Sequence, residues 1–230
     1  VFLRGGTYAV KETLALGEED SGAPGSPILY AAWKDEKPIL SAGFVVRDFK
    51  PADSPRLPSA ARGKALVADV RAQGYGHFEP LPSYGFTVGE NTGKQPMTDL
   101  YHGAKRLEPA RWPNEGWRKI LGGNPTNGTV RVALDDWDVW THEPGLMITA
   151  YPSALWADLT CPVTDFDRER GEITMAAGRR LTRIKEGHPW FFSNALCALD
   201  APGEWYLDRA AGLLYVMPDG REGPFVLSDF

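Results

Sequence analysis

Short runs of apolar and β-branched residues, separated by glycine and proline, make up most of the chain. In the first 49 residues no 3.6-residue period of apolar positions appears, so we predict no helix there. Instead, the runs predict short strands, and the glycines and prolines between them predict turns. The strands predicted in this part span residues 1–3, 7–10, 13–16, 28–32, 39–41 and 44–46.

The next segment changes in composition. Residues 50–62 are rich in proline and serine and have little that could pack, so we interpret them as a linker. Residues 64–70 follow as a strand bracketed by glycines, and residues 76–98 are polar with many prolines and glycines, as in a loop-rich crossing.

Alternating apolar and polar positions return between residues 129 and 175. This period of two is typical of antiparallel strands with one buried face. We therefore predict a small antiparallel β-sandwich or barrel, with a tight turn at residues 168–171. Its strands are expected at residues 129–134, 138–141, 146–150, 156–160, 163–167 and 172–175.

A β-hairpin is the clearest single element of the sequence. Two apolar-aromatic runs, 204–207 and 213–217, flank the polar, glycine-containing connection 208–212. Pro202 and Gly203 lead into the first run, because proline cannot donate to a strand ladder and glycine relaxes the turn. A second hairpin is expected around His102 and Gly103, followed by an edge strand that ends at Trp112 before a proline.

Composition and charge limit the classes of partner that the chain is expected to bind. The 230 residues carry a net charge of −5, which argues against nucleic acid, because neutralising phosphates requires a basic surface. No stretch approaches the roughly 18 apolar residues of a membrane span. Cys161 and Cys197 have no metal-ligand spacing, and two small buried hydrophobes are the better interpretation than a disulfide.

One cluster has the chemistry of sugar recognition: a guanidinium fork, an amide and aromatic faces lie close together in sequence, and the later hairpin adds a carboxylate and an indole. The alternative is structural: Arg111 would pair with a carboxylate and Trp112 would fill a domain seam, since any single Trp is more often core. The candidate substrate-binding residues are Arg111, Trp112, Asn114, Trp117, Glu204 and Trp205.

The sequence contains no recognisable catalytic motif. A glycoside hydrolase needs two carboxylates at a fixed separation, but neither Asp200 with Glu204 nor Asp165 with Asp167 is diagnostic. The four histidines fall in predicted loops without a partner pattern. A calcium loop is disfavoured, because the acidic cluster lacks the EF-hand spacing and its turn glycine. We predict no catalytic residue, metal or cofactor in this chain; the acidic cluster is Asp135, Asp136 and Asp138.

Three stretches resemble large secreted right-handed parallel β-helix proteins that act on polysaccharides. Arg-Gly-Gly-Thr-Tyr at 4–8 is similar to an early rung of pectate-lyase-like helices. Ala-Arg-Trp-Pro-Asn at 110–114 and the hairpin region 199–218 resemble proteins related to glycoside hydrolase family 141. The architecture is also similar to that of the family 120 xylosidases.

The resemblance implies an all-β fold in which the start of a right-handed parallel β-helix is interrupted by an inserted antiparallel β-sandwich or barrel. The domains would be N-terminal coils and linker at 1–62, the inserted domain with its closing hairpin at 63–220, and the returning β-helix at 221–230. Both ends of the sequence look like strands cut short, so we expect a piece of a longer exported protein.

The function implied is part of a glycoside hydrolase, secreted or periplasmic, that acts on plant cell-wall or related polysaccharide. The catalytic carboxylates would follow this chain, and its partners would be the glycan and the remainder of its own β-helix. Relatives usually have acidic residues where this chain has Cys197 and Ala198, which puts some substrate contacts in doubt. A carbohydrate-binding or structural β-module without catalysis and a polysaccharide lyase fragment stay open as alternatives.

Overall fold

The chain is all-β, as predicted. The computed structural model describes residues 1–10, 12–88, 98–133, 143–176 and 181–228. Strands and single 3₁₀ turns are the regular elements of these residues. The 3₁₀ turns are η1 (Glu18–Asp20), η2 (Phe86–Val88) and η4 (Leu196–Ala198). None of the described helices has the length and apolar character that crossing a bilayer requires.

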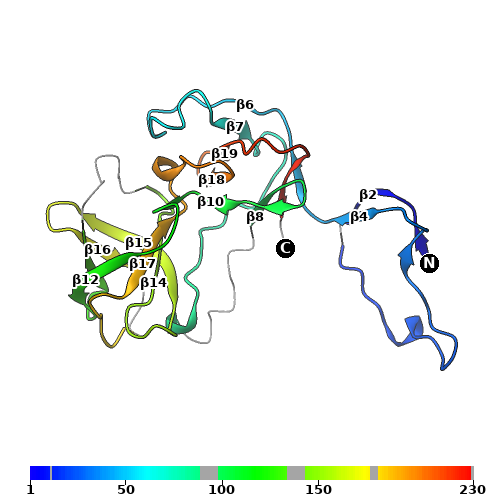
Figure 1. Cartoon of the computed structure of the whole chain (residues 1–230), viewed down its shortest axis with the longest axis horizontal. Helices are drawn as coiled ribbons and strands as arrows, with labels where there is room; N and C mark the ends of the chain where they lie inside the picture. The colour runs from blue at the N-terminus through cyan, green and yellow to red at the C-terminus, as the bar shows by residue number, and fades with distance from the viewer. Residues whose placement is uncertain (11, 89–97, 134–142, 177–180, 229–230) are drawn as a thin grey trace.

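Six antiparallel strands close into a barrel, on the left in Figure 1. The closing pair joins β14 to β17, with Ile148 opposite Phe192. A short strand, β11 (Arg111–Trp112), extends the barrel sheet by pairing with the end of β17. The predicted inserted antiparallel domain is therefore a closed barrel. Its strands are β12 (Arg118–Asn124), β13 (Thr129–Val132), β14 (Met147–Ala150), β15 (Leu159–Asp167), β16 (Glu172–Met175) and β17 (Pro189–Ser193).

The barrel interior is filled by alternate side chains of its strands, because successive residues of a strand point to opposite faces. Fully buried side chains from all six strands form one core. Cys161 and Cys197 belong to this core as free thiols, which agrees with their interpretation as small hydrophobes. Burial raises the pKa of the Cys161 thiol to about 12.

Several strand predictions need correction. The end of the run 156–160 and the whole run 163–167 belong to one nine-residue strand, β15, which begins at Leu159 and continues through Pro162. Neither β12 nor β17 was predicted, and residues 13–16 form no strand. The strand predicted at 138–141 lies outside the described residues, as does the acidic cluster at 135–138.

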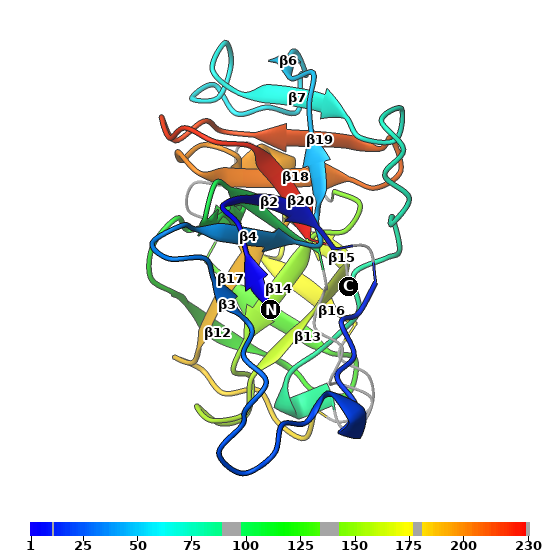
Figure 2. The ribbon, with the colours of Figure 1, turned by 90° about the vertical axis from the view of Figure 1, so that its right-hand side faces the viewer.

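A five-stranded sheet lies beside the barrel and contains the predicted hairpin. Strands β18 and β19 pair in antiparallel fashion, from Trp205 opposite Val216 to Asp208 opposite Leu213. Figure 2 shows β7 next to them. Alternate residues of the hairpin enter two different cores: Trp205 packs in one and Tyr206 in the other. The strands in sheet order are β10 (Glu108–Pro109), β18 (Glu204–Asp208), β19 (Leu213–Val216), β7 (Leu66–Asp69) and β6 (Lys50–Pro51).

A four-stranded sheet contains the other predicted hairpin, and it places one histidine differently from the sequence expectation. His102 ends a strand rather than lying in a loop: its ring stacks on Phe225 at 4.1 Å, and its Nδ1 lies 2.7 Å from Asp219 Oδ1. The strands in sheet order are β5 (Phe44–Val46), β20 (Phe225–Ser228), β8 (Asp99–His102) and β9 (Lys105–Arg106).

Residues 1–10 and 12–41 form an arm that extends away from the other sheets (Figure 1). Two short parallel pairs shape it: β1 (Phe2–Leu3) with β3 (Ala31–Ala32), and β2 (Gly6–Ala9) with β4 (Pro38–Ser41). These pairs fall short of the parallel β-helix expected here, which stays a prediction. Large apolar side chains of the arm are exposed: Val1, Phe2, Tyr8, Leu14, Leu16, Ile28, Leu29, Tyr30, Trp33, Ile39 and Leu40.

The segment 50–62 is packed, contrary to its interpretation as a linker with little to bury. Leu57 and Ala61 are fully enclosed in the core that also holds Tyr206. Its Arg56 contacts Glu143 and Asp208, which come from two other parts of the chain. The barrel strands fall within the predicted unit 63–220, and the domain boundaries themselves stay a prediction.

Candidate functional site

Three of the six predicted residues line one groove of about 150 Å³ beside the five-stranded sheet. Arg111 comes from β11 and Glu204 from β18, while Asn114 follows β11 directly. β10 pairs with β18 in parallel, with Glu108 opposite Glu204, so their side chains share a face. The groove is lined by Lys105, Arg106, Glu108, Arg111, Asn114, Ala201, Pro202, Gly203 and Glu204.

Glu204 ties the groove together from inside. The side chain is only 4% exposed, and each carboxyl oxygen accepts backbone N–H groups. Oε1 accepts from Arg111 at 3.1 Å, and Oε2 accepts from Asp200 and Ala201 at 3.0 Å each. Burial raises the pKa of Glu204 to about 7, against the opposite effect of these hydrogen bonds. Both oxygens are occupied, so this carboxyl group holds the 200–203 turn to β11.

Arg111 and Asn114 are also engaged by the protein. The Asn114 amide donates to Asp200 Oδ1 at 2.7 Å. The Arg111 guanidinium donates to the Gly116 carbonyl at 2.8 Å and lies 4.1 Å from the ring centre of Phe191. These contacts fix both side chains at the groove edge without filling it, as a pre-organised polar site requires.

Trp117 is the most exposed of the predicted tryptophans, at 44%. Its ring meets Phe191 at 4.7 Å and Tyr151 at 5.6 Å between ring centres. The Arg111 guanidinium also lies over Phe191, so this ring connects Trp117 to a groove residue. An exposed, supported indole of this kind offers an apolar face to a sugar ring.

Trp112 and Trp205 lie apart from the groove because neighbouring residues of a strand point to opposite faces. Trp112 packs against Trp190 of the barrel at 5.9 Å, with the Arg118 guanidinium 5.0 Å from its ring centre. Trp205 is buried, and its Nε1 donates to the Leu107 carbonyl at 3.3 Å. Both side chains therefore pack in the interior, and Trp205 also lines the second cavity described next.

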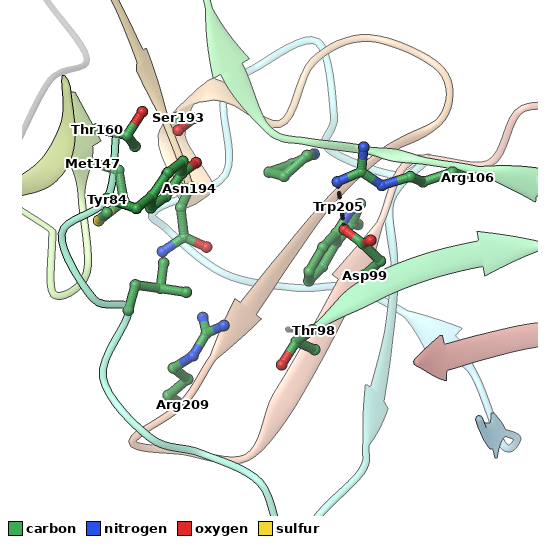
Figure 3. A pocket seen from close by; sticks show the side chains of 12 residues that line it. Tyr84, Thr98, Asp99, Arg106, Met147, Thr160, Ser193, Asn194, Trp205 and Arg209 are labelled. Carbon is green, nitrogen blue, oxygen red and sulfur yellow. Dashed lines mark hydrogen bonds and ion pairs between the residues drawn. The ribbon is translucent and has the colours of Figure 1, made fainter. Parts of the chain in front are cut away.

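A second cavity, of about 90 Å³, was not anticipated from the sequence. It lies where the barrel meets the two other sheets, and Figure 3 shows the Arg209 guanidinium pointing into it. Arg209 is in the turn of the β18–β19 hairpin, where the residue pattern predicts only a connection. No sequence signal marks it, because burial of a turn arginine depends on the neighbouring barrel.

Catalysis within the groove would fall to Glu108 and Glu204, the two carboxylates on its walls. Glycosidases use such a pair, one carboxyl with a raised pKa and one ionised. Glu204 has the raised pKa, but its oxygens are both held by backbone donors. Among the described residues, no group of three His, Cys, Asp or Glu side chains is arranged to hold a metal ion.

The chain matches no protein-family model and no curated protein sequence. A solved structure described as "Glycoside hydrolase" matches 98% of this chain with a TM-score of 0.66 and 20% sequence identity. The match covers 37% of that chain, so the present chain spans just over a third of its length. At this identity the likeness concerns the fold alone: the chain has a glycoside hydrolase-like, all-β fold.

Proposed function

We propose that this chain is part of a secreted or periplasmic glycoside hydrolase that acts on plant cell-wall or related polysaccharide, and that it contributes glycan contacts. The observation that carries the proposal is the fold likeness to a glycoside hydrolase over 98% of the chain. The groove with Arg111 and Asn114, next to the exposed face of Trp117, is the surface that fits a sugar.

The N-terminal arm supports a packing partner within the same protein. Its short strands pair in parallel, Phe2 with Ala31 and Thr7 with Ile39, and parallel pairing is the arrangement that a solenoid would need. Large apolar side chains of the arm are exposed, and exposed apolar surface favours an interaction site. The proposed occupant is further β-helix of the same chain, and catalytic carboxylates would lie on those coils.

A second candidate function is catalysis by this chain itself, which the facing carboxylates Glu108 and Glu204 favour. In that case Glu204 would act as the acid and Glu108 as the nucleophile or base. The three backbone donors on Glu204 favour a positioning role instead, because proton transfer to a glycosidic oxygen needs a free carboxyl oxygen.

The deciding experiment is proton NMR of the 230-residue chain with xylan, pectin and fucosylated oligosaccharides. Broadening of ligand lines without products, lost in Trp117→Ala and kept in Trp33→Ala, is expected. New anomeric signals that vanish in Glu108→Gln would place catalysis in this chain, and unsaturated products would indicate a lyase. No effect on any glycan would make the chain a structural β-module.

A further inference from the structure

The Arg209 cavity combines a fixed cation with hydroxyl, amide and apolar walls. Asn194 and Ser193 border it from the end of β17, Thr160 from β15, and Tyr84 from the preceding loop. Trp205 adds an apolar wall, which Figure 3 shows opposite Asn194. Hydroxyl and amide groups beside an indole are the surroundings in which proteins hold sugars.

The backbone of the Arg209 turn is held rigidly. Gly212 N–H donates to the Asp208 carbonyl at 2.7 Å, and Ala211 N–H donates to the Asp208 carboxylate at 3.0 Å. The Arg71 guanidinium donates to the carbonyls of Arg209 and Ala210 at 2.9 and 3.1 Å. These contacts fix the point at which the Arg209 side chain leaves the backbone, which reduces the entropy lost by the turn on binding.

One nitrogen of this guanidinium lacks a partner. Arg209 Nη1 is buried and has no hydrogen-bond partner among the residues that the structure describes. A buried donor left unpaired is destabilising, and more so when the group is charged. Burial also lowers the pKa of Arg209. An acceptor with negative charge, entering from outside, would satisfy both the donor and the charge.

The charges around the cavity favour an anion. Asp99 is the acidic residue among the lining residues, and Arg106 already pairs with it at 2.7 Å. Arg209 forms no such ion pair among the described residues, although the charge of Glu79 acts on it. Its planar fork matches a carboxylate in geometry. The volume of about 90 Å³ corresponds to roughly three water molecules, enough for a carboxylate and the adjoining ring edge.

We propose that the cavity binds the carboxylate of a hexuronate residue, with Arg209 as its fork-shaped partner and Asn194, Tyr84 and Trp205 around the sugar. This rests on the proposed function and names its substrate class: an acidic glycan. A free carboxylate or phosphate ion is the other source of the same chemistry, and the probes below separate the two.

The test is a two-dimensional ¹H–¹⁵N NMR titration of the full chain with methyl galacturonoside. Its methyl ester, methyl galactoside, sodium acetate and inorganic phosphate are the comparison probes. Amides of Arg209, Gly212 and Asn194 are expected to shift with the galacturonoside. Arg209→Gln should weaken its binding by about ten-fold or more, because a charge-assisted pair is lost. Arg209→Lys, with charge but no fork, should fall between.

Arg170→Gln is the matched control. Arg170 is an exposed arginine outside the cavity lining, and it pairs with Asp167. Binding unchanged in Arg209→Gln, or equal for the neutral galactoside, would overturn the proposal. Equal binding of acetate or phosphate would reduce the cavity to a small-anion site. If Arg209→Gln does not fold, the titration of the wild-type chain decides. The absence of chemical-shift changes at the Arg209 and Asn194 amides would then contradict the proposal. If neutral oligosaccharides shift only the NMR signals of Trp117, the result would support the proposed function and contradict this inference.

Discussion

Glu204 is a predicted substrate-binding residue whose carboxyl group also has a structural role in the fold. The carboxyl group is buried and accepts three backbone N–H groups, so it joins the 200–203 turn to β11 at the point where the chain enters the barrel. A buried acceptor with all its donors in place stabilises such a junction, and removing it leaves those donors unpaired.

Stability should depend on pH through Glu204. Burial raises the pKa of this carboxyl to about 7 from 4.5, so between these values the folded chain binds more protons than the unfolded chain. The free energy of unfolding should therefore fall by about 3 kcal/mol as pH rises through this window, and level off above it. Urea unfolding of wild type and Glu204→Gln across the window measures the difference. A difference between the two proteins that does not change with pH would contradict the assignment.

Asp219 should act in the opposite direction. Although burial raises its pKa, hydrogen bonds from His102 and the Arg221 backbone, with the charge of His102, hold the pKa below 3.8. The unfolded state then binds more protons in acid, so this stabilisation is present above pH 3.8 and lost as pH falls. Asp219→Asn should remove part of the acid sensitivity in circular dichroism melts. Asp167→Asn, at an exposed ion pair, should not, and equal effects would refute the role.

At the scale of elements, strands with alternating apolar and polar residues were predictable from the sequence. Strands that contain glycine or proline were not. Hairpin β18–β19, β13, β14 and β16 follow from alternation. β12 ends in Gly122, Gly123 and Asn124, which signal a turn in isolation. In the fold, position 123 requires glycine, because a Cβ there would clash with the backbone of β13 at Thr129. Tertiary packing overrides the local signal.

Gly123→Ala should therefore open the β12–β13 pairing. The substitution places a Cβ against the Thr129 carbonyl at a φ of +157°, which favours glycine. We expect a loss of roughly 2–4 kcal/mol, from thermal unfolding, since backbone strain and steric clash add. Gly76→Ala is the control, because a Cβ at Gly76 would meet no atom within 4 Å and the φ of this residue is ordinary. A loss as large at Gly76 would mean that the close approach is not the cause.

The candidate site was only partly predictable for the same reason. Arg111, Asn114 and Glu204 do converge on one groove, because the residues came from stretches that the fold brings together. Trp112 and Trp205 turn into cores, since a sequence fixes alternation but not which face meets which core. Arg209 carried no pattern at all: its burial arises from the barrel, the β8–β9 sheet and the hairpin meeting.

At the scale of the whole molecule, an ionic cluster joins parts far apart in sequence. Arg56 lies 2.9 Å from Asp208 Oδ2, 3.1 Å from the Tyr206 hydroxyl and 3.4 Å from Glu143 Oε2. Glu143, 1% exposed, also accepts the Leu196 N–H, so the cluster links segment 50–62, the barrel and the hairpin. Removing one partner of such a cluster leaves an uncompensated buried charge.

Arg56→Met should destabilise the chain by about 2–4 kcal/mol, because Glu143 then stays buried without its cation. Adding Glu143→Gln should restore part of this loss, and a double-mutant cycle by urea unfolding gives the coupling energy. Arg62→Met, a neighbouring arginine with a single hydrogen bond to a backbone carbonyl, is the control. Additive losses in the cycle would show that the cluster does not couple the three parts.

The strand pairs at the mouth of the barrel have an evolutionary consequence. Arg111, where the chain enters the barrel sheet, lies directly opposite Ser193, where it leaves. Insertions are tolerated where both ends of the added segment lie close together, because the host fold then closes across a short gap. Residues 111–193 thus have the geometry of a cassette. A lineage could gain, lose or exchange this barrel while the surrounding sheets kept their register.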